Sequence, residues 1–309
     1  MGTNNYTIID AHVHVIEHIA GLGRKGEFRA VGKGRARWLD GEEVQIVPSS
    51  WGDVSFTHDK LIEILDEHGV SKAILMQGSF YGFCNEYTFE AQERHAGRLY
   101  GMGTFDPFAF EARAIAEHLV RSFHFRGLKF EISRAFGLSG YHSDLELDGP
   151  AMQWIWELAE SEGLVVSLDL GTFGEPSLQI DGLVAIAKRH PGITFVAEHI
   201  FYPGRDHYAE VRSSLEKLAP ISNINVTIAS IPNSVMPEAY PFPSACRYIA
   251  IAKELLGSAR ILWGSDIPSV AVKASYRELI DYVRDGGIFS EPELAQVYAE
   301  NAARVYGLS

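Results

Sequence analysis

The sequence predicts a single (β/α)8 barrel spanning residues 1–309, with an insertion after its first strand and an extra helix at its C-terminal end. Parallel strands need a crossover connection, and the segments between the β-rich runs have the helical periodicity that supplies one. A length of 309 residues suits one closed barrel, while a doubly wound open sheet is the alternative. Eight β-rich runs alternate with these segments, at residues 6–10, 72–77, 99–105, 127–132, 164–169, 193–198, 224–229 and 260–264.

Two segments fall outside this alternation. Residues 17–51 form the predicted insertion, and the alternating pattern from Trp38 to Val47 predicts a β-hairpin that partly covers the mouth of the barrel. Residues 291–308 predict one or two helices packed outside the barrel. We see no convincing boundary between domains.

Composition and charge narrow the class of protein. Hydrophobic residues make up 46% of the chain and charged residues 22%, which is typical of a globular protein with a large core. A net charge of −13 disfavours nucleic acid as a partner. We expect a small-molecule substrate instead. The two cysteines, and the lack of a leader pattern or an apolar run of about 18 residues, predict a cytoplasmic protein without membrane contact.

A His-x-His pair marks the end of the first predicted strand. His12 and His14 are two positions apart, so on a strand both imidazoles project to the same side. Two imidazoles so placed can share one divalent cation. The pattern also arises by chance, and its position after an apolar strand is what favours a metal site.

Two further polar residues follow apolar strands in the same way. His199 ends the sixth predicted strand and Asp266 follows the eighth. Taken singly, His199 could be a buried histidine bonded to a carbonyl, and Asp266 a turn or a helix cap. Active sites of (β/α)8 barrels lie at the C-terminal ends of the strands, however, and four polar groups at that level favour an active site.

At these residues the sequence resembles the amidohydrolase superfamily, in particular its amidohydrolase-2 (amidohydrolase-related) branch. That branch includes aminocarboxymuconate-semialdehyde-type decarboxylases and lactone hydrolases. The closing Gly-Ser-Asp-x-Pro is the most specific part of the resemblance. The motifs that carry it are Ile8 to His14, Gly127 to Phe130, Glu198-His199, and Leu262 to Pro268, with Met76 to Gly82 similar to lactonase-like members.

The resemblance implies one divalent metal ion, zinc or manganese, bound by His12, His14 and Asp266, with His199 beside the substrate or the attacking water. Metal-dependent relatives usually have a histidine at the end of strand five, where this chain has Asp169. A carboxylate can ligate a hard cation, so Asp169 is a fourth candidate ligand. Alternatively the metal is absent, and the histidines and Asp266 act directly on substrate and water.

Three other residues are candidate substrate contacts. Lys129 lies on strand four, where the resemblance implies a partner for a substrate carboxylate or a structural ion pair with Glu131 or Asp169. Tyr81 and Asn85 follow strand two and could line the pocket. Packing in the pocket wall is an equally good interpretation of both.

The favoured function is metal-assisted hydrolysis of a small lactone, ester or amide, with Asp266 as general base and His199 steadying the oxyanion. A non-oxidative decarboxylase of an aromatic or dienoic acid on the same site is the alternative. Asp169 favours hydrolysis, because the decarboxylases that the chain resembles have a histidine at that position. A barrel that has lost activity and only binds is a third possibility, but it would gain nothing from burying these groups. Branch members are commonly dimers, which implies a possible homodimer.

Overall fold

Eight parallel strands form the core of the molecule. The computed structural model describes residues 6–308. Each strand overlaps its predicted range, although the first begins three residues later than predicted. The strands form one group ordered β1-β6-β7 and a second ordered β12-β11-β10-β9-β8. They are β1 (Ile9–Val13), β6 (Lys72–Leu75), β7 (Leu99–Gly101), β8 (Gly127–Glu131), β9 (Val165–Asp169), β10 (Thr194–Ala197), β11 (Ile224–Thr227) and β12 (Ile261–Leu262).

Backbone hydrogen bonds join the two groups at both of their edges and close the ring. At one seam, Lys129 N–H donates to Gly103 O at 2.8 Å, directly beyond the end of β7. At the other, Ala11 N–H donates to Trp263 O at 3.1 Å and His14 N–H to Ile267 O at 2.9 Å. A closed ring leaves no strand edge unpaired. The predicted (β/α)8 barrel is therefore confirmed, and the open sheet is excluded.

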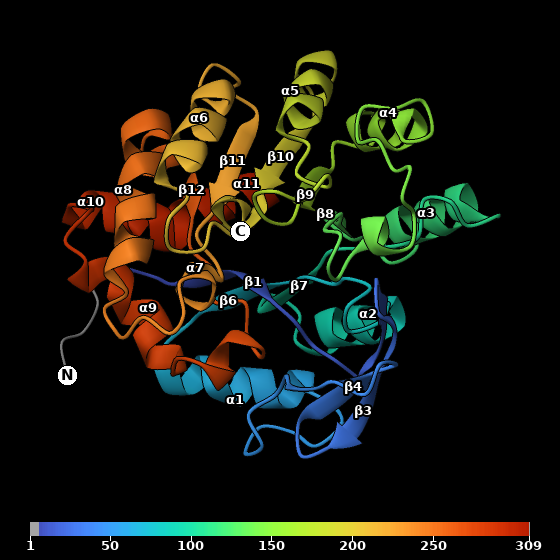
Figure 1. Cartoon of the computed structure of the whole chain (residues 1–309), viewed down its shortest axis with the longest axis horizontal. Coiled ribbons are helices and arrows are strands. Elements are labelled where there is room, and N and C mark those ends of the chain that lie inside the picture. Colours follow the sequence, from blue (N-terminus) through green and yellow to red (C-terminus); the bar gives the residue numbers. More distant parts are fainter. Residues whose placement is uncertain (1–5, 309) are drawn as a thin grey trace.

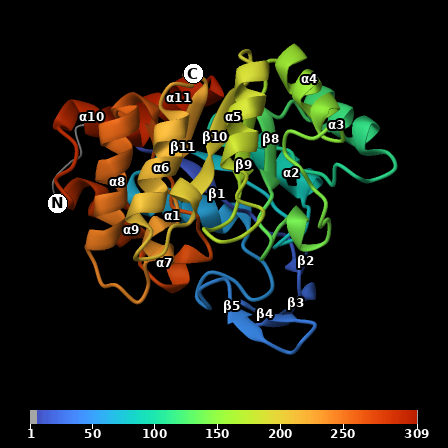
Figure 2. The same ribbon diagram turned by 45° about the horizontal axis from the view of Figure 1, so that its top comes forward.

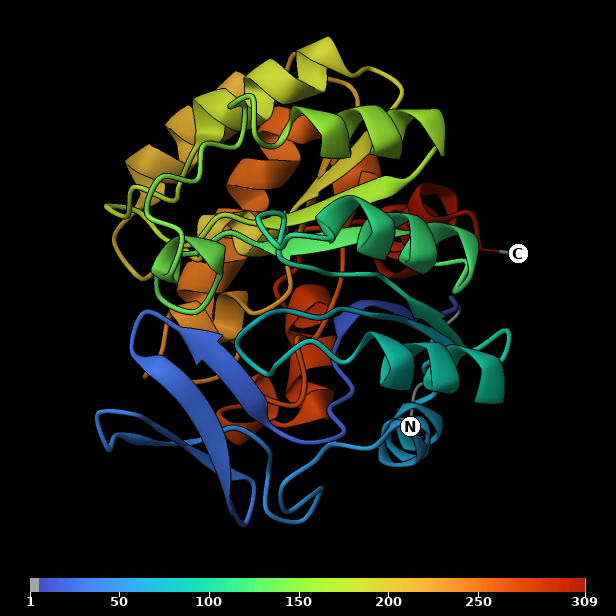
Figure 3. The same cartoon turned by 90° about the vertical axis from the view of Figure 1, so that its right-hand side faces the viewer.

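Amphipathic helices cover the outside of the barrel (Figures 1 and 3). The first of them begins where the Thr57 side chain accepts a hydrogen bond from Lys60 N–H, and it ends at Gly69 with φ 70°. None of the helices within residues 6–308 has the length and apolar character needed to cross a bilayer. They are α1 (His58–His68), α2 (Asn85–Arg94), α3 (Ala112–Arg121), α4 (Gln153–Ser161), α5 (Ile180–Arg189), α6 (Tyr208–Leu218), the short α7 (Ile231–Ser234), α8 (Pro243–Leu256) and α9 (Tyr276–Asp285).

The C-terminal segment closes one end of the barrel. It continues from α10 (Glu291–Ala295) through a π-helical turn (Gln296–Glu300) into α11 (Asn301–Tyr306). Its residues pack with apolar side chains of the strands in one buried cluster that includes Ile9, Ala11, Ile74, Val165, Val196, Leu262, Ala299, Ala302, Val305 and Tyr306. The predicted position outside the barrel is thus corrected, because these helices seal the N-terminal ends of the strands.

The insertion is a four-stranded antiparallel sheet, larger than the predicted hairpin. Its strands are β2 (Ala20–Gly23), β3 (Gly26–Gly32), β4 (Arg35–Trp38) and β5 (Glu43–Gln45), in that order. Figure 2 shows it projecting from one end of the barrel. Leu22 N–H donates to Ser79 O at 2.8 Å, and a Cβ at Gly21 would lie 1.9 Å from Phe80 O, so the backbones touch. This contact fixes the sheet to the loop after β6.

A buried carboxylate reinforces the seam between β1 and the segment after β12. Asp10 is fully buried and accepts hydrogen bonds from Ser265 N–H at 2.9 Å, Tyr276 Oη at 2.8 Å and His12 N–H at 3.2 Å. Burial raises the pKa of Asp10 to about 6 against these three donors. One side chain therefore holds together three segments that meet at the seam.

We expect Asp10→Ala to lower the free energy of unfolding by at least about 3 kcal/mol, because each donor left unsatisfied in the interior costs roughly 1–3 kcal/mol. Tyr276→Phe removes a single donor and should cost about 1 kcal/mol. Urea unfolding followed by circular dichroism measures both. Equal losses in the two variants would contradict a bridging role for the carboxylate.

Candidate active site

A cavity of about 320 Å³ opens at the C-terminal ends of the strands. It contains every site residue predicted from the sequence except Asn85: His12, His14, Tyr81, Lys129, Asp169, His199 and Asp266. Val44, Gln45 and Ile46 of the insertion form part of its wall, as predicted for a segment that partly covers the mouth. Its remaining lining includes Phe80, Glu131, Phe136, Glu175, Tyr202, Ser230, Asn233, Ser269 and Lys273.

A bulge in β1 directs both histidines of the His-x-His pair into this cavity. The pairing of β1 with β6 shifts register between Asp10 and Val13. Within this stretch the consecutive residues Ala11 and His12 both face the barrel interior, and His14 does so beyond it. A Cβ at Gly264 would lie 2.8 Å from the Cβ of His12, so the segment after β12 needs glycine to pass this bulge.

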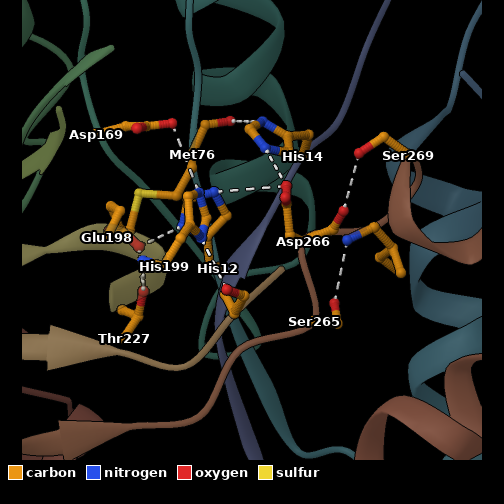
Figure 4. A network of polar contacts seen from close by, with 12 residues as sticks. His12, His14, Met76, Asp169, Glu198, His199, Thr227, Ser265, Asp266 and Ser269 are labelled. Carbon is orange, nitrogen blue, oxygen red and sulfur yellow. Dashed lines mark hydrogen bonds and ion pairs between the residues drawn. The ribbon is translucent and has the colours of Figure 1, made fainter. Parts of the chain in front are cut away.

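Three imidazoles are held in the same way, through Nδ1 (Figure 4). His14 Nδ1 lies 2.9 Å from Met76 O, and His199 Nδ1 lies 2.9 Å from Ala229 O. Because a carbonyl only accepts, Nδ1 of each ring carries the proton, and Nε2 of the neutral ring has a free lone pair. His12 Nδ1 donates in the same manner to Oε2 of Glu198 at 2.9 Å.

The Nε2 atoms of His12 and His14 converge on one carboxylate oxygen. Asp266 Oδ1 lies 3.1 Å from His14 Nε2 and 3.7 Å from His12 Nε2. Burial would raise the pKa of Asp266, but its contact with the His14 ring and the charge of His12 hold it well below its ordinary value. Burial lowers the pKa of His14 to about 4. A neutral His14 lone pair then faces a carboxylate oxygen, which is favourable only with a cation or a proton between them.

The conformation of Asp266 depends on the hydrogen-bonded seam between β1 and the segment after β12. Its φ of 60° is left-handed, a region that aspartate tolerates better than most residues. Its N–H donates to His12 O at 2.8 Å. This bond couples the position of the carboxylate to the backbone of the His-x-His pair.

Glu198 is a buried residue beside the cavity to which the sequence reasoning assigned no role. Besides His12 it accepts hydrogen bonds from the hydroxyls of Ser167 and Thr227. Burial would raise the pKa of Glu198, but the charge and the Nδ1–H of His12 hold it at about 2. In turn the Glu198 carboxylate raises the pKa of His12 in spite of burial. The signal available was the Glu-His pair at the end of strand six, where a carboxylate can orient a ligating histidine.

His199 begins a left-handed turn that carries two side chains into the cavity. Residues 199–202 all have positive φ, between 45° and 67°, and Tyr202 N–H closes the turn on His199 O at 3.0 Å. Left-handed backbone costs roughly 1–2 kcal/mol per residue, so packing must hold the turn in place. A hydrogen bond from His199 N–H to the Thr227 hydroxyl at 3.1 Å contributes to this. Strain of this kind is typical of functional sites.

Asp169 lies apart from the cluster that the other predicted ligands form. Its Oδ2 is 3.7 Å from His199 Nε2, and its Oδ1 accepts a hydrogen bond from Gly171 N–H at 2.9 Å. Within residues 6–308, the donor groups that approach within 4.8 Å of one another in the cavity are His12, His14 and Asp266, and His12, Glu198 and His199. Three of the four predicted metal ligands therefore come together, while Asp169 pairs with His199 instead.

A buried ion pair occupies the side of the cavity formed by β8. Lys129 Nζ lies 3.8 Å from Glu131 Oε2, and the two side chains are 2% and 11% exposed. Burial raises the pKa of Glu131 to about 7, although Lys129 opposes the shift. Lys129 thus has the ion-pair partner that the sequence analysis named, and it also faces the cavity.

Asn85, a predicted substrate contact, does not line the cavity. Its Oδ1 accepts hydrogen bonds from Gln77 Nε2 and Thr104 N–H, both at 3.0 Å, and its Nδ2 donates to Thr104 O at 2.8 Å. These bonds join the start of α2 to the segment after β7. Sequence position alone placed Asn85 near the pocket, but it could not show that the amide is already engaged.

A closed (β/α)8 barrel with histidines and carboxylates converging at the strand C-termini defines a class of barrel enzymes. The model of the family described as Amidohydrolase matches residues 9–308, and the chain belongs to that family. It is therefore an enzyme, and the resemblance drawn from the sequence motifs is confirmed. None of the curated proteins matches the chain.

Solved structures with the same fold include hydrolases and decarboxylases. An amidohydrolase from Burkholderia multivorans is 17% identical with a TM-score of 0.73, covering 98% of this chain and 100% of its own, and a second crystal form contains zinc. A candidate 2-pyrone-4,6-dicarboxylic acid hydrolase from Acinetobacter baumannii, with citric acid bound, is 18% identical (TM-score 0.68, 97% and 99% covered). The 5-carboxyvanillate decarboxylase from Sphingomonas paucimobilis is 17% identical (0.55, 80% and 82%).

The ion pair on β8 predicts a pH-dependent effect on stability. The pKa of Glu131 is raised in the folded protein, so its contribution to stability is fully present below about pH 4.5 and is lost as the pH rises through about 7. Lys129→Met removes the ammonium that limits this rise, so the loss extends to higher pH. We expect the Tm of the variant to fall further below wild type at about pH 8.5 than at about pH 5.5, as measured by calorimetry.

Lys273→Met is the matched control, because Lys273 is an exposed lysine of the same cavity. Its effect on Tm should not depend on pH. An equal deficit of Lys129→Met at both pH values would show that the lysine does not compensate the buried carboxylate.

Proposed function

We propose that this enzyme hydrolyses a small lactone, ester or amide, and that it uses one divalent cation held by His12, His14 and Asp266. One observation carries the proposal. Two imidazoles anchored through Nδ1 direct Nε2 at the same carboxylate oxygen, at 3.1 and 3.7 Å. Metal-ligating histidines are anchored in this way, and a cation removes the repulsion between the His14 lone pair and Asp266.

The donor set suits zinc or manganese. Two imidazole nitrogens and one carboxylate oxygen are a set that zinc accepts at catalytic sites, where a further position stays open to water or substrate. When bound, such a cation polarises a carbonyl and lowers the pKa of water. Zinc in the similar amidohydrolase from Burkholderia multivorans supports the choice. Glu198 would then act behind His12 and hold its ring.

Asp266 is the group placed to accept a proton. Both of its histidine contacts use Oδ1, and within the described part of the chain Oδ2 has no hydrogen-bond donor. The low pKa of Asp266 keeps it ionised at neutral pH. Its free Oδ2 would accept the proton of an attacking water, the role of a general base, provided that a bound cation lowers the pKa of that water.

His199 is the group placed to stabilise charge on the substrate oxygen. Its Nδ1–H is engaged by Ala229 O, so Nε2 faces the cavity beside Asp169. With a proton on Nε2, His199 would donate a hydrogen bond to the oxyanion that develops during attack. Asp169, 3.7 Å from Nε2, acts in this proposal by orienting the ring, a role different from the ligand predicted for it.

The lining of the cavity supports a flat, partly apolar substrate. Phe80, Tyr81, Phe136 and Tyr202 supply aromatic surface, and Lys129 is a cation that can orient a carboxylate or carbonyl oxygen. A volume of about 320 Å³ suits a small molecule.

Decarboxylation of an aromatic or dienoic acid is the second candidate function. Glu131, whose pKa is raised to about 7, lies in the cavity and can hold a proton at neutral pH. Protonation of carbon is the step that such a decarboxylase needs. The decarboxylase from Sphingomonas paucimobilis also supports this candidate. Incubation with panels of lactones and of hydroxybenzoates separates the two, since ring-opened acid indicates hydrolysis and carbon dioxide indicates decarboxylation.

We expect Asp266→Asn to reduce kcat on the substrate so identified by roughly 10²–10⁴-fold, as for loss of a general base. Asp144→Asn, an exposed carboxylate outside the cavity, is the matched control and should retain wild-type turnover. Steady-state kinetics with the same metal content in each protein measures both. Full turnover by Asp266→Asn would remove Asp266 from this role.

Glu198→Gln tests the metal site through its support of His12. The amide keeps the shape of the side chain but loses the charge that orients the imidazole, and such changes cost roughly 10–100-fold in metal affinity. Competition with a chelator of known affinity measures the change. Unaltered affinity in a correctly folded variant would mean that Glu198 does not support His12 as a ligand.

A further inference from the structure

A second cluster of metal-binding groups lies outside the barrel, where the N-terminus of α1 meets the C-terminal end of α2. His58 and Asp59 are the first two residues of α1, and His95 caps α2. His58 Nδ1 is 3.0 Å from His95 Nε2, and Asp59 Oδ1 is 3.2 Å from each of these nitrogens. Three donor atoms from two helices thus form a nearly equilateral triangle.

The triangle has the dimensions of a tetrahedral metal site. With bonds of about 2.0–2.1 Å, two ligands of a tetrahedral zinc ion lie about 3.3 Å apart. The three separations here, 3.0, 3.2 and 3.2 Å, are close to that value. Hydrogen bonds alone satisfy this arrangement less well. If one ring nitrogen donates its proton to the other, the accepting nitrogen has no proton to donate to Asp59. A cation above the triangle contacts all three atoms at once.

The histidines are held in place, and the site is open on one side. The ring of His58 packs against Tyr87, with ring centroids 5.2 Å apart, and its side chain is only 4% exposed. His95 is 18% exposed and Asp59 is 64% exposed, so a metal ion and a water ligand can approach from the side of Asp59. Arg94, which precedes His95, is paired with Glu90 at 3.4 Å, so its positive charge is partly offset.

We propose that His58, Asp59 and His95 bind a second divalent cation of the zinc class, and that this ion joins α1 to α2. Two imidazoles and a carboxylate suit zinc, and a water would complete the tetrahedron. The ion would stabilise the position of α2 against α1. The loop that precedes α2 carries Tyr81 and is hydrogen-bonded to the insertion sheet, so the ion would also stabilise this part of the cavity wall. The proposal does not depend on the cation in the cavity.

The test is metal titration of the whole protein after dialysis against a chelator. With zinc, calorimetry should find two equivalents for wild type. His95→Gln and Asp59→Ala should each lose one equivalent, or at least roughly tenfold in its affinity, and should lose the accompanying rise in Tm. His14→Ala should lose the other equivalent, which separates failure of the cavity site from failure of this one.

Glu63→Gln is the matched control. Glu63 is an exposed carboxylate on the same helix, paired with Lys60 and outside the triangle, so its removal changes the charge of α1 in the same way as Asp59→Ala. It should keep both equivalents. Asp59 is exposed, and therefore its loss cannot be confused with a failure to fold. Full zinc affinity and full thermal stabilisation in Asp59→Ala and His95→Gln would overturn the proposal.

Discussion

The hydrogen-bonded seam between β1 and the segment after β12 is the constraint on which the active site depends. All three proposed ligands of the cavity cation come from these two segments, and Asp266 N–H donates directly to His12 O. The seam also closes the barrel, and Asp10 reinforces it with three hydrogen bonds. The same hydrogen bonds therefore close the barrel and position the proposed metal ligands. A change that opens the seam would disturb both.

Most of the acidic side chains in and around the cavity lie next to a basic side chain. Glu198 pairs with His12, Lys129 with Glu131, and Asp169 with His199. Asp266 faces two imidazoles, and a neutral His14 cannot neutralise it. Isolated charges are costly to bury, so this local excess of negative charge is the physical reason to place a cation there. Each pair also fixes the orientation of a side chain that the chemistry needs.

The structure differs from several expectations because they depended on contacts that sequence patterns do not encode. The C-terminal helices seal the barrel instead of packing outside it, because their apolar side chains pack with those of the strands in one buried cluster. The insertion is a sheet of four strands because β2 pairs with β3, a pairing without a strong turn signal in its glycine-rich sequence. Asn85 is engaged by the side chain of Gln77 and the backbone of Thr104, and Asp169 lies beside His199. Thr104 and His199 are both distant in sequence from the residue they contact.

The sequence by itself determined the alternation of eight strands with helices, the family, and the residues of the cavity from His12 to Asp266. Periodicity and local motifs carry that information, because side-chain direction within one strand follows from its two-residue repeat. Only the tertiary structure decided which of these residues meet. The bulge in β1, the left-handed turn after β10, and the second cluster at His58, Asp59 and His95 arise from packing between segments far apart in the chain. Spacing in a sequence does not encode such distances.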